Sequence, residues 1–197
     1  MKKPSEVVGN YQLKITLRGT KPPIWRRFVV PSVIKMNHLH DVIQAVMGWY
    51  DGHLHAFDIG NERYTAMSRD GIDLDMEGAD ECRFRLCDVI GRPKSKFTYE
   101  YDFGDGWEHQ LMLEKLLAVG ESTAFVCLAG KGACPLEDCG GIGGYYHLLE
   151  VLAHPDDPEH DDMKEWVGGE INPDEFDLDA VNKSLEPMRS RYAGQKP

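Results

Sequence analysis

The sequence lacks the long apolar runs and the common catalytic motifs by which many proteins are classified. Its 197 residues contain no stretch of about 20 apolar residues, the length that a membrane-spanning helix needs. The opening Met-Lys-Lys-Pro-Ser-Glu is not followed by the apolar segment of a signal peptide, so we expect a cytoplasmic protein without a membrane partner. There is no Gly-Lys-Ser/Thr phosphate loop, no dinucleotide-binding glycine fingerprint and no Gly-x-Ser-x-Gly motif. These absences argue against the NTPases, dehydrogenases and serine hydrolases that carry such motifs.

Positive charge is scarce outside the first quarter of the chain. The net charge is −11, yet residues 1–50 carry eight Lys/Arg and two Asp/Glu, a net charge of +6. Residues 150–197 carry 13 acidic and 5 basic side chains, and such a segment would repel phosphate. A protein or nucleic-acid partner is therefore expected at the basic N-terminal region. The oligomeric state is not indicated by the composition.

Five residues are candidates for that binding role. Arg26 and Arg27 stand beside Trp25, and two further aromatic residues, Tyr101 and Trp107, occur later in the chain. Arginine and aromatic side chains dominate the energetics of interfaces, and aromatic rings stack on nucleic-acid bases. We therefore expect these side chains to supply anchoring or stacking contacts.

Cysteine is present in an odd number, five, which does not suit a complete disulfide framework. Two pairs, Cys82/Cys87 and Cys134/Cys139, each enclose four residues, whereas structural zinc pairs more often enclose two. Reduced, partly buried thiols are the favoured interpretation. Cys134 and Cys139 are the better zinc candidates, because they fall in an irregular loop rich in glycine.

The apolar periodicity predicts strands first and helices last. The predicted strands are 11–18, 25–30, 53–59, 63–66 and 125–128, with a hairpin over 96–116, and the predicted helices are 37–49, 144–153, 158–167 and 177–187. Asn37, Asp157 and Asp177 are expected as helix N-caps, and the polar residues 67–80 as a mobile loop. The fold class is then α+β, with a mainly antiparallel sheet, one early helix packed on it and a helical C-terminal part. The length suits a single domain, 1–197, with a sheet-rich core over 8–130 and a glycine-rich loop with short helices over 131–190.

The segment from Tyr99 to His109 combines aromatic residues, carboxylates and a histidine around Asp105-Gly106. Asp-Gly is a strong signal for a two-residue hairpin loop. Such a loop would place Asp102 directly opposite His109 on one face, close enough for a polar contact. Asp102, Asp105 and His109 are therefore candidate catalytic residues.

Two alternatives remain at this hairpin. A three-residue loop would pair Asp102 with Glu108, and the proposed site would disappear. A structural polar face without chemistry explains the same residues.

His53 and His55 alternate on a predicted strand, so they are expected on one face of the sheet. Two histidines with a carboxylate suit zinc or another divalent metal such as manganese. Asp102, Asp105 and His109 would complete the set only if the sheet brings them near. The cofactor is otherwise unknown.

Several ordered segments together resemble one family. These segments are Pro23-Ile-Trp-Arg-Arg27, Leu39-His40 with Met47-Gly-Trp49, His53-Leu-His-Ala-Phe57, Tyr101-Asp-Phe-Gly-Asp-Gly-Trp-Glu-His109, Cys134-Pro-Leu-Glu-Asp138 with Gly140-Gly141, and His154-Pro to His160. The chain is similar, over roughly residues 10–187, to the plasmid pRiA third-open-reading-frame (ORF-three-like) family. Some members of that family carry the label of TnpR passenger protein of an insertion sequence. The resemblance implies a compact prokaryotic α+β domain linked to mobile elements, and it implies no defined activity.

Two functional hypotheses follow. The first is a non-enzymatic accessory module, linked to mobile elements, that binds a protein or nucleic-acid partner. The alternative is a metal-dependent hydrolase or nuclease using His53, His55, Asp102, Asp105 and His109. A true resolvase is not expected, because the C-terminal region is acidic where a resolvase needs a basic DNA-binding helix. Whether the protein is an enzyme stays open.

Overall fold

A computed structural model describes residues 9–66 and 77–192, and it has the predicted mixed α+β class. The strands are β1 (Gly9–Leu17), β2 (Trp25–Pro31), β3 (His55–Ile59), β4 (Glu62–Thr65), β5 (Ala79–Asp80), β6 (Lys96–Tyr101), β7 (Trp107–Ala118) and β8 (Val126–Lys131). The helical segments are α1 (Met36–Met47), the short 3-10 helix η1 (Glu81–Arg83), α2 (Leu86–Val89), α3 (Gly141–Ala153), α4 (His160–Val167), α5 (Leu178–Ser184) and α6 (Glu186–Tyr192). No helix in the described ranges is long and apolar enough to cross a membrane.

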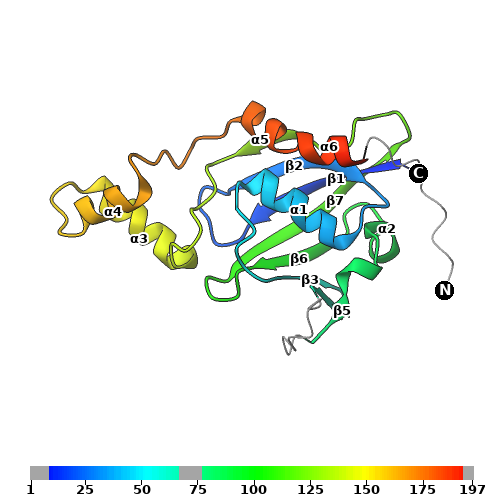
Figure 1. Cartoon of the computed structure of the whole chain (residues 1–197), viewed down its shortest axis with the longest axis horizontal. Helices are drawn as coiled ribbons and strands as arrows, with labels where there is room; N and C mark the ends of the chain where they lie inside the picture. Colours follow the sequence, from blue (N-terminus) through cyan, green and yellow to red (C-terminus); the bar gives the residue numbers. More distant parts are fainter. Residues whose placement is uncertain (1–8, 67–76, 193–197) are drawn as a thin grey trace.

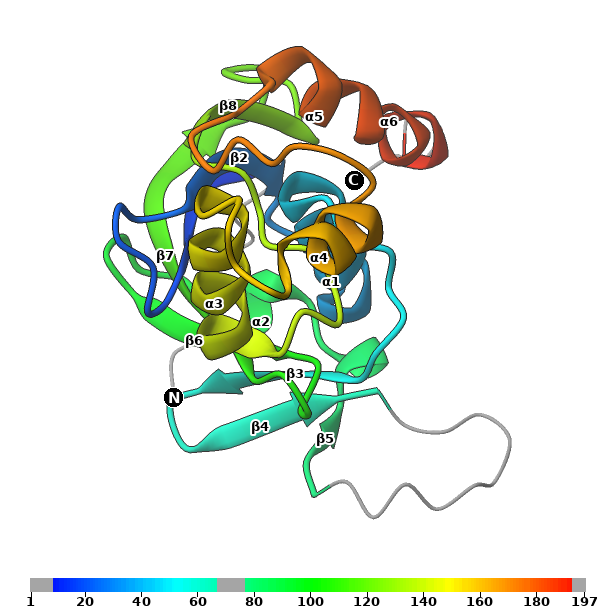
Figure 2. The same ribbon diagram turned by 90° about the vertical axis from the view of Figure 1, so that its left-hand side faces the viewer.

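The strands form one sheet in the order β5-β4-β3-β6-β7-β1-β2-β8. Every neighbouring pair is antiparallel except β4 and β5, which run parallel. Helices α1, α5 and α6 lie over one face, whereas α3 and α4 project beyond one end of the sheet (Figures 1 and 2). We call α3 and α4 together the helical arm. The other face of the sheet carries half-buried polar side chains, as antiparallel sheets with one solvated face do.

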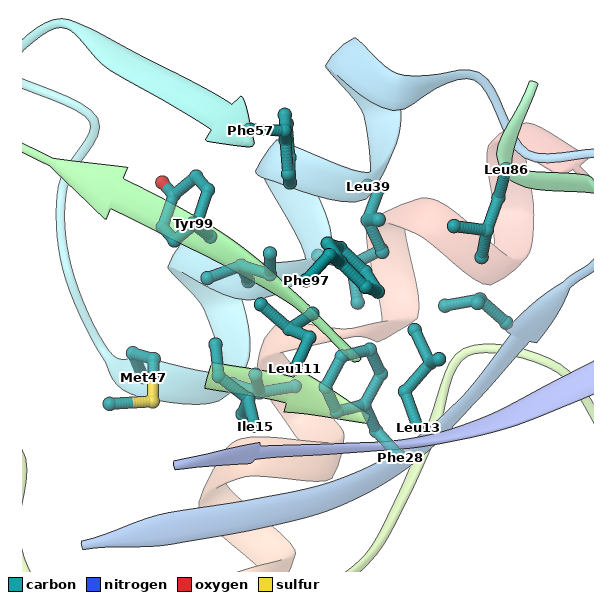
Figure 3. Close-up of a cluster of buried hydrophobic side chains, with 14 of the residues drawn as sticks. Leu13, Ile15, Phe28, Leu39, Met47, Phe57, Leu86, Phe97, Tyr99 and Leu111 are labelled. Carbon is teal, nitrogen blue, oxygen red and sulfur yellow. The ribbon is translucent and has the colours of Figure 1, made fainter. Parts of the chain in front are cut away.

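Alternation along the strands builds the core between the sheet and α1. Leu13 and Ile15 of β1, Phe28 of β2 and Leu111 of β7 all lose their solvent exposure against Leu39 of α1 (Figure 3). Complete burial of one such side chain contributes about 1.5–3 kcal/mol. The predicted apolar stripe of the early helix is therefore the contact that fixes α1 on the sheet.

Some predicted boundaries and caps differ from the structure. Helix α1 begins after Lys35 without a side-chain cap, so the prediction that Asn37 caps it is wrong. Helix α4 begins at His160, after Glu159, also without a side-chain cap, so the prediction that Asp157 caps it is wrong too. Asp177 does cap α5, because its carboxylate accepts a hydrogen bond from a backbone amide of the first turn. The predicted final helix is divided at the buried Leu185 into α5 and α6. Most of the segment predicted as a mobile loop, residues 67–76, lies outside the described residues.

The β6–β7 hairpin has a longer turn than the Asp-Gly signal predicts. Tyr99 pairs with His109, and Tyr101 pairs with Trp107, which leaves residues 102–106 as the turn. Asp102 adopts a left-handed backbone with φ of 55°, and its carbonyl oxygen accepts a hydrogen bond from the amide of Gly106. The predicted pairing of Asp102 with His109 is therefore wrong, and so is the alternative that pairs Asp102 with Glu108.

The helical arm is attached to the loops at the end of the sheet. The amide of Gly140, just before α3, donates to the carboxylate of Asp105 at the hairpin tip, over 3.1 Å. The amide of Lys21, in the β1–β2 loop, donates to the hydroxyl of Tyr146 on α3. Gly141 adopts φ of 66° and lies against the backbone of Asp105 so closely that a Cβ there would collide. The hairpin tip and the start of α3 therefore form one junction.

Candidate metal centre

Three side chains from separate parts of the chain meet at this junction. His53 Nε2 lies 3.1 Å from Asp138 Oδ1, and His53 Nδ1 lies 3.7 Å from Asp102 Oδ2. One ligand atom from each of the three residues lies within 4.8 Å of the other two, and no other such group occurs among the described residues. We call these three residues the metal cluster, because one imidazole and two carboxylates are suitable donors for a divalent ion.

The turn of the hairpin holds Asp102 in place. Its Oδ1 accepts a hydrogen bond from the amide of Gly104 at 3.0 Å and a longer one from the amide of Asp105 at 3.4 Å. Its own amide donates to Leu54 O, which ties the turn to the segment that carries His53. The Asp102 side chain is mostly buried, and its Oδ2 is the oxygen nearest to His53. One carboxylate oxygen is thus fixed by the backbone while the other faces the cluster.

Glu137 positions both Asp138 and the segment before His53. Its Oε1 accepts hydrogen bonds from the Tyr50 amide at 2.8 Å and from the Tyr101 hydroxyl at 2.7 Å. Burial and the nearby Glu137 carboxylate raise the pKa of Tyr101, so its phenol stays protonated and donates. Asp138 follows with φ of 60° and an exposed carboxylate. The loop that carries Asp138 is therefore hydrogen-bonded to the sheet through the preceding residue, Glu137.

His55 does not belong to this cluster, although the sequence places it on the same strand face as His53. Strand β3 begins only at His55, so His53 lies before the regular alternation. The buried His55 pairs through Nε2 with Glu81 Oε2 at 2.9 Å, and its ring stacks on His40 at 3.5 Å. The expectation that both histidines share one metal is therefore wrong.

His109 is fully buried and forms no ion pair with any described residue. Its Nδ1 donates to Trp107 O at 3.0 Å, and its Nε2 has no hydrogen-bond partner in the described part of the chain. Burial lowers the pKa of His109 to about 3, so the ring is neutral at ordinary pH. The candidate catalytic residues therefore separate: Asp102 joins the cluster, Asp105 tethers the helical arm, and His109 belongs to the core.

The predicted binding residues also have different environments. Tyr101 and Trp107 are fully buried, so neither is available to stack on a partner. Arg26 is 3% exposed and donates to three backbone carbonyl oxygens, those of Trp25, Val46 and Lys131. The predictions for these three residues as a partner-binding surface are contradicted by their burial.

Arg27 and Trp25 remain on the solvated face of the sheet. Arg27 Nε lies 2.6 Å from Glu114 Oε2 in a two-pronged pair. The Lys14 ammonium lies 4.7 Å from the centroid of the half-buried Trp25 ring, and the Arg27 guanidinium lies 5.3 Å from it. These contacts favour a local structural role for the ring, whose partner-binding role stays a prediction.

Cys134 and Cys139 are free, half-buried thiols. Burial raises the pKa of both, that of Cys139 to about 11. No third ligand joins them within the described part of the chain. A metal ion held by this pair is therefore not favoured.

Sequence reasoning overlooked Asp138 as a candidate ligand. The signal was present in Cys134-Pro-Leu-Glu-Asp138, a segment quoted for the family resemblance without a chemical role. Glu137 and Asp138 are consecutive carboxylates in a loop that precedes glycines, a pattern usually explained by a turn. The sequence alone does not distinguish a turn residue from a candidate metal ligand. The distinction comes from the contact between this loop and the hairpin tip.

Comparison with known proteins gives consistent matches along nearly the whole chain. A family model described as plasmid pRiA4b ORF-3-like protein matches residues 9–180. The uncharacterised protein y4hQ of Sinorhizobium fredii (strain NBRC 101917 / NGR234) is 33% identical over 189 residues, which cover 95% of this chain and 96% of that protein. The crystal structure of a protein of unknown function from Methanosarcina mazei Go1 is similar with a TM-score of 0.77 and 35% identity, covering 87% of this chain and 97% of that one.

Proposed function

This chain belongs to the plasmid pRiA4b ORF-3-like family, and from the donor set inside its matched region we propose that the protein is a divalent-metal-dependent hydrolase. The observation that carries the proposal is the convergence of His53, Asp102 and Asp138 from three loops. Asp102 is 49 positions after His53 and 36 positions before Asp138, so local structure does not bring the three together. They converge because the hairpin, the entry to β3 and the helical arm meet at one junction.

The donor set suits a catalytic ion better than a purely structural one. Structural zinc sites in proteins have four protein ligands, mostly cysteine and histidine, whereas catalytic sites use three and leave a position for water or substrate. Two carboxylates also balance the charge of a divalent cation. Zinc and manganese both accept this combination of nitrogen and oxygen donors. A bound ion would polarise a substrate oxygen and make a coordinated water more acidic.

The supporting contacts restrict how the ligands move. Backbone amides hold the far oxygen of Asp102, and Glu137 fastens the loop of Asp138. Outer contacts of this kind orient metal ligands and tune their affinity. Asp138 is the exposed member, so solvent and substrate reach the cluster from its side.

Metal analysis of protein purified without a polyhistidine tag tests the proposal. We expect one zinc or manganese ion per chain after loading, and loss of that ion in His53→Ala and Asp138→Asn. The matched controls are His154→Ala and Asp161→Asn, because both residues are exposed and lie outside the cluster. Metal-dependent turnover of esters, amides or phosphodiesters should disappear in the same two cluster variants. Substoichiometric metal in the loaded wild type, or equal uptake by His53→Ala, contradicts the proposal.

A second candidate is the accessory role at a mobile element, through nucleic-acid binding on the solvated sheet face. A hollow of about 670 Å³ lies there, lined by Gln12, Arg27, Lys94, Lys96, Met112, Glu114 and Lys115. Lys94, Lys96 and Lys115 are exposed, and none has an ion-pair partner within the described residues. This local excess of positive charge on an acidic protein favours a polyanion.

Fluorescence anisotropy with a labelled DNA or RNA 20-mer tests this second function. The affinity should fall with salt, and each lysine-to-alanine change among Lys94, Lys96 and Lys115 should reduce the log–log salt slope by about 0.7–0.9 per lost phosphate contact. Lys164→Ala on α4 is the control, because it removes an exposed lysine elsewhere. Absence of binding at low salt rejects nucleic acid as the partner of this face.

A further inference from the structure

A hollow of about 510 Å³ lies between the two helices of the arm and opens beside the metal cluster. Helices α3 and α4 lie side by side in both views (Figures 1 and 2). Asp138 belongs to the metal cluster and also lines this hollow, so the two are continuous. The volume falls within the range of small-molecule sites, about 300–1,000 Å³.

The walls of the hollow are acidic. Asp138, Glu159 and Asp162 contribute three carboxylates, and neither lysine nor arginine lines the space. The only basic group is His147, whose Nε2 lies 2.8 Å from Glu159 Oε2. That contact gives Glu159 a close polar partner, whereas no ion pair is formed by Asp162 among the described residues. A phosphate group would be repelled here, and a cation would be attracted.

An apolar wall stands beside these acids. Trp166 is 53% exposed, which is unusual for a side chain of its size, and the buried Leu148 also lines the hollow. An indole face attracts a cation through the electrostatics of its ring. Lysine and arginine side chains combine an apolar stem with a cationic end, and they place the stem on apolar surface. The hollow is complementary to both parts of such a side chain.

We propose that this hollow is the specificity pocket of the hydrolase, and that it takes a lysine- or arginine-like side chain of an amide or ester substrate. This inference rests on the proposed function, because the metal cluster supplies the reaction. The hydrolysis adds water across the acyl bond. The water oxygen forms a bond to the acyl carbon and loses one proton, the carbon–nitrogen or carbon–oxygen bond breaks, and the leaving amine or alcohol takes up that proton. The acidic walls disfavour the nuclease alternative for this site.

Binding is measured first, without metal, so that it does not depend on the proposed chemistry. Agmatine is the cationic probe, and isothermal titration calorimetry of the full chain in EDTA gives its dissociation constant. We expect saturable binding that weakens at least tenfold in Asp162→Asn and in Trp166→Ala. Asp161→Asn is the matched control, because the Asp161 carboxylate is next to Asp162 in sequence but is fully exposed and does not line the hollow. Trp166→Phe keeps an aromatic face and should retain most of the affinity.

Turnover is measured second, with metal-loaded protein and paired amide substrates that differ only in one side chain. Lysine and arginine substrates should exceed the glutamate substrate in kcat/KM by at least tenfold, and Asp162→Asn should reduce that ratio. If agmatine does not bind, or if Asp161→Asn weakens binding as much as Asp162→Asn, the pocket assignment is overturned even where metal uptake and turnover succeed. If agmatine binds as expected but no metal is taken up, the pocket stands as a cation site and the hydrolase proposal fails.

Discussion

The guanidinium of Arg26 is enclosed by protein and donates to three backbone carbonyl oxygens, whereas that of Arg27 reaches solvent and pairs with Glu114. Removing Arg26 leaves these buried carbonyl oxygens without a hydrogen-bond donor, and each unsatisfied acceptor costs about 1–3 kcal/mol of stability. Removing Arg27 breaks one partly exposed ion pair, worth about 0–1 kcal/mol. We therefore expect Arg26→Met to lower the free energy of unfolding by roughly 2–4 kcal/mol. Urea denaturation should find a much smaller loss in Arg27→Met, and equal losses would contradict this assignment.

His109 provides a pH-dependent contribution to stability. Burial lowers its folded-state pKa from 6.5 to about 3. Between these two pH values the unfolded chain binds a proton at this residue and the folded chain does not. Above pH 6.5 both states are neutral and no penalty exists. As the pH falls from 6.5 toward 3, this residue costs stability with a limiting slope of about 1.4 kcal/mol per unit.

His109→Leu removes that titration while keeping an apolar volume in the core. The difference in unfolding free energy between the wild type and this variant should therefore change in favour of the variant as the pH falls from 6.5. In the wild-type protein, the ring of His109 should keep its neutral NMR shifts from pH 8 down to pH 5. A ring that titrates near pH 6.5 in the folded protein would show that the burial argument is wrong.

Two of the three glycines in the first turn of α3, Gly141 and Gly143, have different surroundings. Gly141 has φ of 66° and lies against the Asp105 backbone, whereas a Cβ at Gly143 would meet nothing within 4 Å. Gly141→Ala should lower the free energy of unfolding by more than about 1 kcal/mol and weaken metal uptake, because it moves the arm off the hairpin tip. Gly143→Ala should stabilise the helix by about 0.5–1 kcal/mol. Thermal unfolding and metal titration of both variants check this, and similar effects would contradict the close approach at Gly141.

The hairpin illustrates which parts of an element can be read from sequence. Alternation along Tyr99 and Tyr101 correctly predicts a strand with its aromatic rings in the core. The register does not follow, because two local signals compete for the turn. Asp105-Gly106 favours a two-residue loop, but the Asp102 side chain accepts hydrogen bonds from nearby amides and forms a five-residue turn. The change of register moves His109 to the core face, which removes the predicted Asp102–His109 pair.

The fold class was predictable from the sequence, whereas the site was predictable only in part. Strand periodicity and helix caps are local properties, so they indicate the α+β class without any knowledge of topology. His53 and Asp102 were recognised by residue type, but their partner Asp138 depends on where the helical arm docks. That docking is set by contacts such as Gly140 with Asp105, between residues that are 35 positions apart. Sequence patterns do not encode such contacts in one chain taken alone.

In the proposed function, an ion held by side chains from three loops would couple metal binding to the stability of the entire protein. The cluster assembles only when hairpin, β3 entry and arm are all in place, so the ion would bind the folded state and not the unfolded chain. Ligand at 100 times its dissociation constant then stabilises the folded protein by about 2.7 kcal/mol. For a chain of this size each 1 kcal/mol of added stability raises the midpoint of thermal unfolding by about 2–4 °C.

We expect zinc or manganese at 100 times its dissociation constant to raise the midpoint of the wild type by about 5–11 °C. Asp138→Asn should show no rise, and Asp161→Asn should respond as the wild type does. A rise that persists in Asp138→Asn would place the ion elsewhere in the protein.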